Sequence, residues 1–79
     1  MKARITVTLK PGVLGPQGKA IEGALAALGF AGVESVRQGK VFDIELAETD
    51  AARAEAALKA MGEKLLANTV IETYRIDVG

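Results

Sequence analysis

The chain has 79 residues, with neither cysteine nor histidine, and its ten basic and ten acidic side chains give no net charge. That length allows one small domain, which we assign to residues 1–79. The missing residue types exclude disulfides, the usual zinc ligands and a nucleophilic cysteine or serine–histidine pair, so we expect no catalytic residue, cofactor or metal on this chain. Balanced and scattered charge argues against a surface for nucleic acid.

The first half of the chain has the pattern of a strand followed by a helix. Apolar residues alternate with polar ones over residues 3–9, which predicts a half-buried strand. Pro11 and Gly12 end it, and Pro16 suits the first turn of a helix. Gly29 is typical of the left-handed residue that follows a helix. The predicted buried stripe of this helix is Ala20, Ile21, Ala24, Leu25 and Leu28.

The second half predicts two strands, a helix and a last strand. Over residues 33–37 the alternation is imperfect, which suggests a strand with a bulge or one covered on both faces. Gln38 and Gly39 would form a tight turn that leads into a strand over residues 41–47, so that the two strands make a hairpin. Thr49 or Asp50 would cap a second helix that ends near Asn68, and residues 70–78 would form the last strand. The stripe expected for the second helix is Ala54, Ala57, Leu58, Met61 and Leu65.

The resulting order, βαββαβ, predicts an α+β two-layer sandwich of the ferredoxin-like kind. Its mainly antiparallel four-stranded sheet would carry both helices on one face. The other face would then be bare, with small and apolar groups such as Thr6, Thr8, Val41 and Ile71. A thin core and an uncovered face suggest a symmetric homo-oligomer.

Motifs for chemistry are weak. Ser35 is the only serine, and Asp43 and Glu45 fit a solvated strand face better than an acid–base pair. The glycines between the first strand and the first helix do not have the spacing of a phosphate loop, and two prolines remove donors that such a loop needs. The residues alone therefore leave a module that binds other proteins or, as the alternative, a dimeric regulatory module that binds a small molecule.

Three segments resemble the PurS family of phosphoribosylformylglycinamidine synthase subunits. Residues 9–20, LKPGVLGPQGKA, are similar to that family's Val-Leu-Asp-Pro-Gln-Gly-Lys-Ala stretch. Residues 33–40 resemble its Val-Arg-x-Gly-Lys turn, and residues 63–74 resemble its Lys-Leu-Leu-Ala-Asn-Pro-Val-Ile-Glu-x-Tyr stretch. The chain departs from the family at Gly15, where aspartate is usual, and at Thr69, where proline is usual.

The resemblance implies a PurS-like fold and a part in a three-component, glutamine-dependent ligase of purine biosynthesis. In that family a large synthetase subunit (PurL-like) uses ATP and magnesium, and a glutaminase subunit (PurQ-like) releases ammonia from glutamine. The small subunit is a non-catalytic homodimer or tetramer that helps to assemble the other two and assists ammonia transfer. We therefore expect a cytoplasmic protein that binds neither nucleic acid nor membrane, with the start of the chain leading directly into a strand.

Polar residues of the three segments are the candidate contacts with other subunits. We rank four of them first because a purely structural account explains their identities least well. The candidates are Gln17, Lys19, Arg37 and Lys40, followed by Lys64, Asn68 and Glu72.

Overall fold

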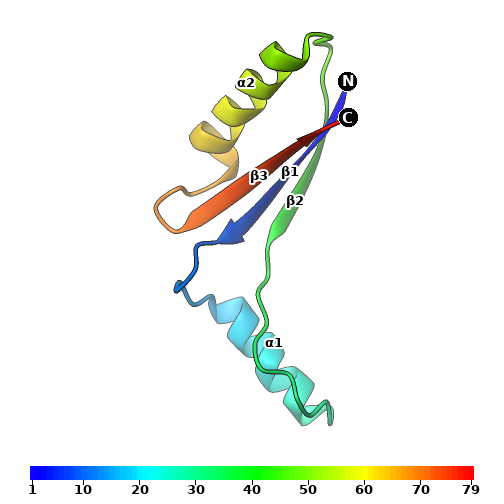
Figure 1. The fold of residues 1–79 in the computed structure, drawn as a ribbon. Coiled ribbons are helices and arrows are strands. Elements are labelled where there is room, and N and C mark those ends of the chain that lie inside the picture. Colours follow the sequence, from blue (N-terminus) through cyan, green and yellow to red (C-terminus); the bar gives the residue numbers. More distant parts are fainter.

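The computed structural model describes all residues, 1–79, as an α+β fold (Figure 1). Three strands form one antiparallel sheet in the order β2-β1-β3. The elements in chain order are β1 (Lys2–Leu9), α1 (Pro16–Ala27), β2 (Lys40–Glu45), α2 (Ala51–Met61), the π-helical turn η1 (Gly62–Leu66) and β3 (Glu72–Val78).

The central strand β1 carries the core. Its inward side chains Ala3, Ile5 and Val7 are buried, because β-branched and small residues alternate there with polar ones. Ile5 lies opposite Phe42 on β2 and Ile76 on β3. One apolar layer therefore runs across the three strands, as the alternation on each strand predicted.

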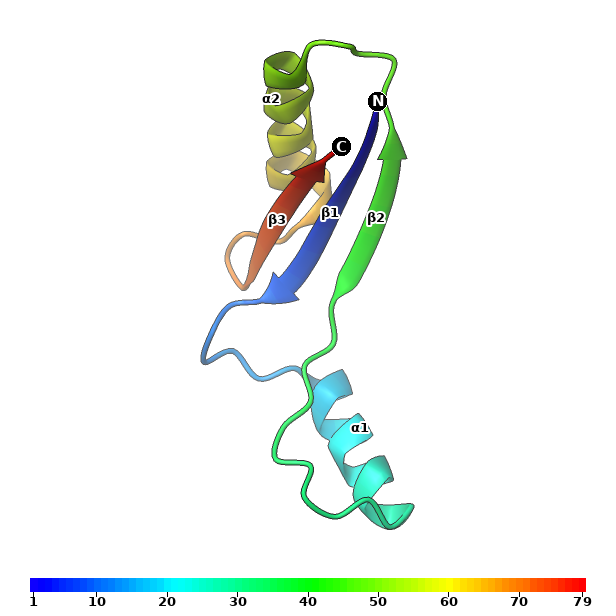
Figure 2. The ribbon, with the colours of Figure 1, turned by 45° about the vertical axis from the view of Figure 1, so that its right-hand side comes forward.

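Helix α2 covers one face of the sheet (Figure 2). Asp50 caps it, since its Oδ1 accepts a hydrogen bond from the backbone N–H of Arg53 at 3.1 Å. Its residues Ala54 and Leu58 are buried, as predicted, but Ala57 is exposed and Leu65 is 82% exposed. The π-helical turn explains the error at Leu65, because its wider turn brings Leu66 and Ala67 rather than Leu65 onto the core.

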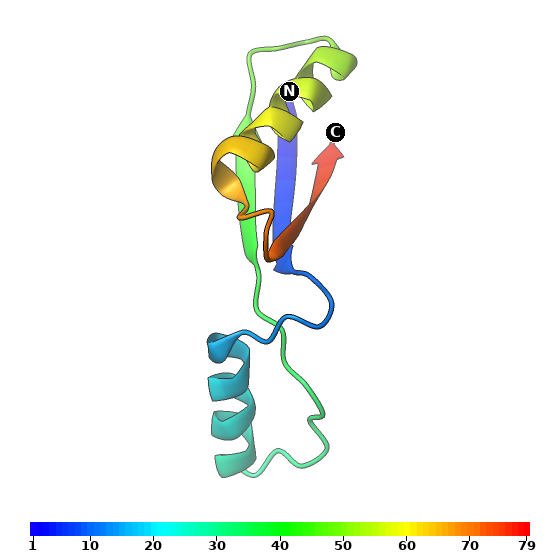
Figure 3. The same cartoon turned by 90° about the vertical axis from the view of Figure 1, so that its left-hand side faces the viewer.

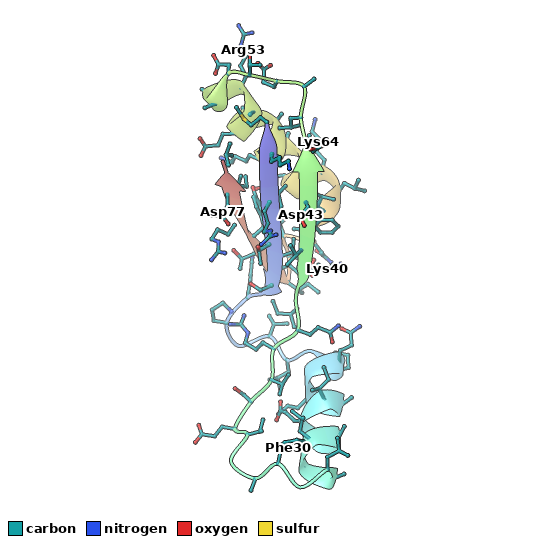
Figure 4. All side chains as sticks on the ribbon, turned by 90° about the vertical axis from the view of Figure 1, so that its right-hand side faces the viewer. Phe30, Lys40, Asp43, Arg53, Lys64 and Asp77 are labelled. Carbon is teal, nitrogen blue, oxygen red and sulfur yellow. The ribbon has the colours of Figure 1, made fainter.

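Residues 10–39 form an arm that leaves the sheet and contains α1 (Figure 3). The arm extends the molecule to 49 × 24 × 15 Å, with a radius of gyration of 15.9 Å. A compact chain of this length has a radius of gyration of about 12 Å. The molecule is therefore elongated, and Figure 4 places Phe30 at the far end of the arm and Arg53 at the opposite end.

The predicted fourth strand is absent, so the four-stranded ferredoxin-like sheet was wrong. Residues 33–37 run back along α1 without strand structure. Val36 donates its N–H to the side chain of Glu22 at 3.3 Å, a hydrogen bond to the helix instead of to a neighbouring strand. Gln38 and Gly39 consequently connect the arm to β2 and make no hairpin.

The prediction that both helices cover one face was also wrong. Along the expected stripe of α1 only Leu25 is partly buried, while Ile21 is 37% and Leu28 is 74% exposed. Gly29 does follow the helix in the left-handed region, at φ 92°. Helix α1 thus forms where the sequence predicts it but leaves its apolar side chains uncovered.

The face of the sheet opposite α2 is bare, as expected, but it is more charged than expected. On this face Arg4 Nε lies 2.8 Å from Asp43 Oδ1, and Arg75 pairs with Asp77 at 3.1 Å. Val41 on the same face is 57% exposed. No helix of the structure combines the length and the apolar character that a membrane span requires.

Candidate functional site

A cavity of about 250 Å³ lies where the arm joins the sheet. The end of β1, the loop before α1, the first turns of α1 and the returning segment 35–38 all contribute to it. Its polar lining residues are Lys10, Gln17, Lys19, Glu22, Ser35, Arg37 and Gln38.

A second depression of about 340 Å³ continues from the first. The two share the lining residues Leu9, Val13, Leu14, Gly15, Gln17 and Gln38. The second adds Lys40 at the start of β2, Ile71, and Glu72 at the start of β3. We call the two depressions together the waist groove.

Close packing between α1 and the returning segment forms one wall of the waist groove. Gly18, the only buried residue of α1, lies against the carbonyl group of Val36 with no room for a side chain. At the entry to β2, a Cβ atom on Gly39 would lie 2.5 Å from the carbonyl oxygen of Val7. Two glycines therefore fix the path of the segment that brings Arg37 and Gln38 to the groove.

The acidic side chains of the waist groove already have partners. Glu22 accepts the Val36 N–H and has Oε1 3.7 Å from Lys19 Nζ. Glu72 accepts a hydrogen bond from the backbone N–H of Asn68 at 2.7 Å. Both carboxylates keep their charge, so they offset part of the charge of the four basic side chains Lys10, Lys19, Arg37 and Lys40 that line the groove.

The basic side chains of the groove are mostly unneutralised. Lys10, Arg37 and Lys40 have no carboxylate within 4.0 Å. Arg37 donates instead to the backbone carbonyl of Leu9, a neutral acceptor that holds the guanidinium at the groove. The waist groove therefore presents positive charge to whatever enters it.

The structure brings most of the sequence-predicted contact residues together. Gln17, Lys19 and Arg37 line the first cavity, and Gln17, Lys40 and Glu72 line the second. These residues come from α1, the returning segment, β2 and β3, and the fold gathers them at one place.

Lys64 and Asn68 lie outside the groove. Lys64 is exposed on η1, and Asn68 has a structural role because its Oδ1 accepts from the N–H of Val70 at 3.2 Å. Its backbone carbonyl also accepts from Ile71 at 3.0 Å. The side chain organises the turn between η1 and β3.

Sequence reasoning did not select Lys10, Glu22 and Gln38, which also line the groove. Lys10 directly precedes Pro11 and Gly12, so the sequence indicates that it lies beside a turn. The sequence does not indicate which way its side chain points. Glu22 lies outside the apolar stripe expected for α1. Its contact with Val36 exists only because the returning segment follows the helix.

No group of three or more acidic side chains is placed to hold a metal ion. On the bare face of the sheet, the hydrogen bond and charge of Asp43 raise the pKa of Arg4. Asp43 is thereby occupied in an ion pair. The lone Ser35 makes no side-chain hydrogen bond and is one of the lining residues of the groove.

The sequence matches a family model over residues 2–79, and that model is PurS, phosphoribosylformylglycinamidine (FGAM) synthase. This chain belongs to the PurS family. A curated relative, the phosphoribosylformylglycinamidine synthase subunit PurS of Synechocystis, is 47% identical over 75 residues, which are 95% of this chain and 75% of the relative. The three resembling segments thus lie within a match that runs almost end to end.

Solved PurS structures have the same fold. PurS of Bacillus subtilis is 42% identical with a TM-score of 0.89, covering 99% of this chain and 96% of that one. PurS of Methanocaldococcus jannaschii, described as a subunit of formylglycinamide ribonucleotide amidotransferase in the purine biosynthetic pathway, is 41% identical with a TM-score of 0.87, covering 99% and 94%. A chain in the structure of PurLQS from Thermotoga maritima is 30% identical with a TM-score of 0.85, covering 96% and 93%. The protruding arm is therefore part of the family's architecture.

Proposed function

We propose that this chain is the small, non-catalytic subunit of a phosphoribosylformylglycinamidine synthase, in which it joins a synthetase subunit to a glutaminase subunit. The observation that carries the proposal is the match to PurS over residues 2–79. The neighbour from T. maritima is a chain of a PurLQS structure, which supports the same three-part composition here. Residues 1–79 would act as a single domain in the cytoplasm.

The shape of the isolated chain supports a role that depends on partners. Its accessible surface is 5732 Å², whereas a compact protein of this mass exposes about 4,500 Å². The excess of about 1,200 Å² exceeds the area of about 800 Å² that one partner buries in a standard interface. Only eight residues are buried, so association would supply much of the missing burial.

Part of this surface fits a homodimer or tetramer. Helix α1 and the following loop expose Ile21, Leu28, Phe30 and Val33. Contact with a second copy would cover these side chains and give α1 the apolar layer that its own sheet does not provide. Sedimentation equilibrium at micromolar concentration is expected to give a multiple of 8.2 kDa, and a mass of one chain would contradict this part.

The ligase chemistry would belong to the other subunits. We propose that the complex uses ATP and magnesium on its synthetase subunit and that this chain assists assembly and ammonia transfer. The candidate contacts Gln17, Lys19, Arg37, Lys40 and Glu72 all line the waist groove. Lys64 remains a candidate on the exposed side of η1, and Asn68 would act by shaping the turn beside it.

Reconstitution with the synthetase and glutaminase subunits from the same source tests the proposal. With ATP, magnesium and glutamine, formation of the amidine product is expected to need all three chains. The control replaces glutamine by ammonia, which should reduce the need for the glutaminase. Equal glutamine-dependent rates with and without this chain, and no ternary complex on gel filtration, would refute the assignment.

A further inference from the structure

We propose that the waist groove binds an acidic segment of a partner subunit, through carboxylates that pair with Lys10, Lys19, Arg37 and Lys40. This inference rests on the proposed function and names the chemistry of one contact. It starts from an imbalance of charge. Four basic and two acidic side chains line the groove, and of the basic ones only Lys19 has a carboxylate partner, Glu22.

The imbalance is local, since the chain as a whole is neutral. Residues 10–40 contain four basic and two acidic side chains, and the remaining residues contain six basic and eight acidic ones. Positive charge is thus concentrated where the arm meets the sheet. A field of one sign in a concave surface attracts ligands of the opposite sign and speeds their association.

The bare sheet face provides a contrast. A depression of about 570 Å³ there is lined by Arg4, Asp43, Arg75 and Asp77. Both arginines are paired with these aspartates, at 2.8 and 3.1 Å. Of the three cations that line this depression only Lys2 lacks a carboxylate partner, whereas the waist groove leaves three of its four cations without one.

The groove has the form of a site for a chain segment. Its two depressions are continuous, so the basic groups are spread along it from Lys10 to Lys40. Leu14, which lines both depressions, is 75% exposed and offers apolar contact between the charges. A single phosphate or free amino acid would use one end only, while an extended acidic segment would pair with both.

Arg37 is the best positioned of the four. Its hydrogen bond to the Leu9 carbonyl anchors the guanidinium without neutralising it. An anchored guanidinium loses less side-chain entropy when it binds a carboxylate, and it has further N–H groups for a bidentate contact. Lys10, Lys19 and Lys40 would contribute mainly to charge and to the rate of association.

The test compares two pairs of substitutions, each of which removes two positive charges, in the three-subunit complex. The first variant, Lys10→Gln with Lys19→Gln, removes two charges from the groove and leaves the Arg37 anchor intact. The matched control, Arg53→Gln with Lys59→Gln, removes the same charge from α2, and Arg53 lies at the end of the molecule opposite the arm (Figure 4). Affinity for the partner subunits is measured by interferometry at several salt concentrations, with circular dichroism to verify folding.

The groove variant is expected to bind about tenfold more weakly at low salt and to lose much of the salt dependence of Kd. The control variant is expected to change Kd by less than about twofold. A further variant, Arg37→Lys, keeps the charge but removes the planar guanidinium and its paired N–H donors, and it should weaken binding as well.

Three outcomes would overturn the inference while leaving the proposed function standing. One is that the groove variant binds with an unchanged Kd and salt dependence, while the complex made with the unsubstituted chain assembles and is active. Another is a changed self-association of the isolated groove variant in sedimentation, which would assign the groove to a second copy. The third is saturable binding of phosphate or glutarate to the isolated chain that needs Lys19 and Arg37, combined with normal assembly. If the parent chain itself fails to assemble, the proposed function fails.

Discussion

Gly18 of α1 lies directly against the backbone carbonyl of Val36, closer than any residue with a side chain could approach. This contact joins the helix to the segment that returns toward β2. Together with the hydrogen bond from the Val36 N–H to Glu22, it holds the arm in one shape. The waist groove depends on that shape, because Lys19 lies on one side of the contact and Arg37 on the other.

Gly18→Ala is therefore expected to destabilise the arm, although alanine normally favours a helix. Its Cβ would meet a backbone atom that cannot move aside, at a cost of about 1–3 kcal/mol for overpacking. Urea unfolding followed by circular dichroism measures the effect. The control is Gly23→Ala in the same helix, where nothing lies within 4 Å and stability should rise by about 0.5–1 kcal/mol. Equal gains for both variants would contradict the close contact.

The only tyrosine should titrate at unusually high pH. Tyr74 Oη donates to Glu63 Oε1 at 2.8 Å, and this hydrogen bond, desolvation and the nearby negative charge raise its pKa. The folded pKa exceeds the unfolded value of about 10. The contribution of protonated Tyr74 to the free energy of unfolding is therefore complete below about pH 10 and is lost as the pH rises through the folded pKa.

Absorbance of the phenolate reports on this residue alone, because the chain has one tyrosine and no tryptophan. The midpoint is expected to be higher in the folded chain than in urea. Glu63→Ala should lower it toward the unfolded value, whereas Glu55→Ala, on α2, should leave it unchanged, because Glu63 is the carboxylate that shifts the phenol. Identical midpoints in folded and unfolded chains would refute the hydrogen bond.

The cap of α2 provides a third prediction. Asp50→Ala removes the acceptor for the Arg53 N–H and should lower the free energy of unfolding by about 1 kcal/mol. Thr49→Ala, one residue earlier, should change it by less than about 0.5 kcal/mol, since the Thr49 side chain makes no hydrogen bond and only its backbone N–H does. The sequence allowed either residue as the cap, and a larger loss at Thr49 would reverse the assignment.

The sequence predicted the elements better than their arrangement. Alternation located all three strands and helical spacing located both helices, because these patterns reflect local backbone geometry. What it missed depends on contacts distant in sequence. Residues 33–37 carry a weak strand pattern, and only the position of α1 decides that Val36 bonds to Glu22 instead of to β2.

The candidate site shows the same division. Gln17, Lys19, Arg37 and Lys40 were selected as residues without a structural explanation, and the structure gathers all four along one groove. That selection rested on a family resemblance, which carries information about partners that a single chain does not contain. Lys10 and Glu22 were missed because their directions depend on the bend between β1 and α1.

The π-helical turn leads to the last prediction, which concerns two neighbouring leucines. Leu66 packs against the core, whereas Leu65 is 82% exposed. A regular continuation of α2 would have placed Leu65 inward, four residues after Met61 and seven after Leu58. The wider turn at η1 shifts the inward position by one residue.

Leu66→Ala should therefore cost about 1–2 kcal/mol of unfolding free energy, because it opens space beside partly buried apolar neighbours. Leu65→Ala is the matched control and should cost less than about 0.5 kcal/mol in the isolated chain. Chemical denaturation of both variants measures the difference, and the reverse order would mean that α2 continues as a regular α-helix to its end.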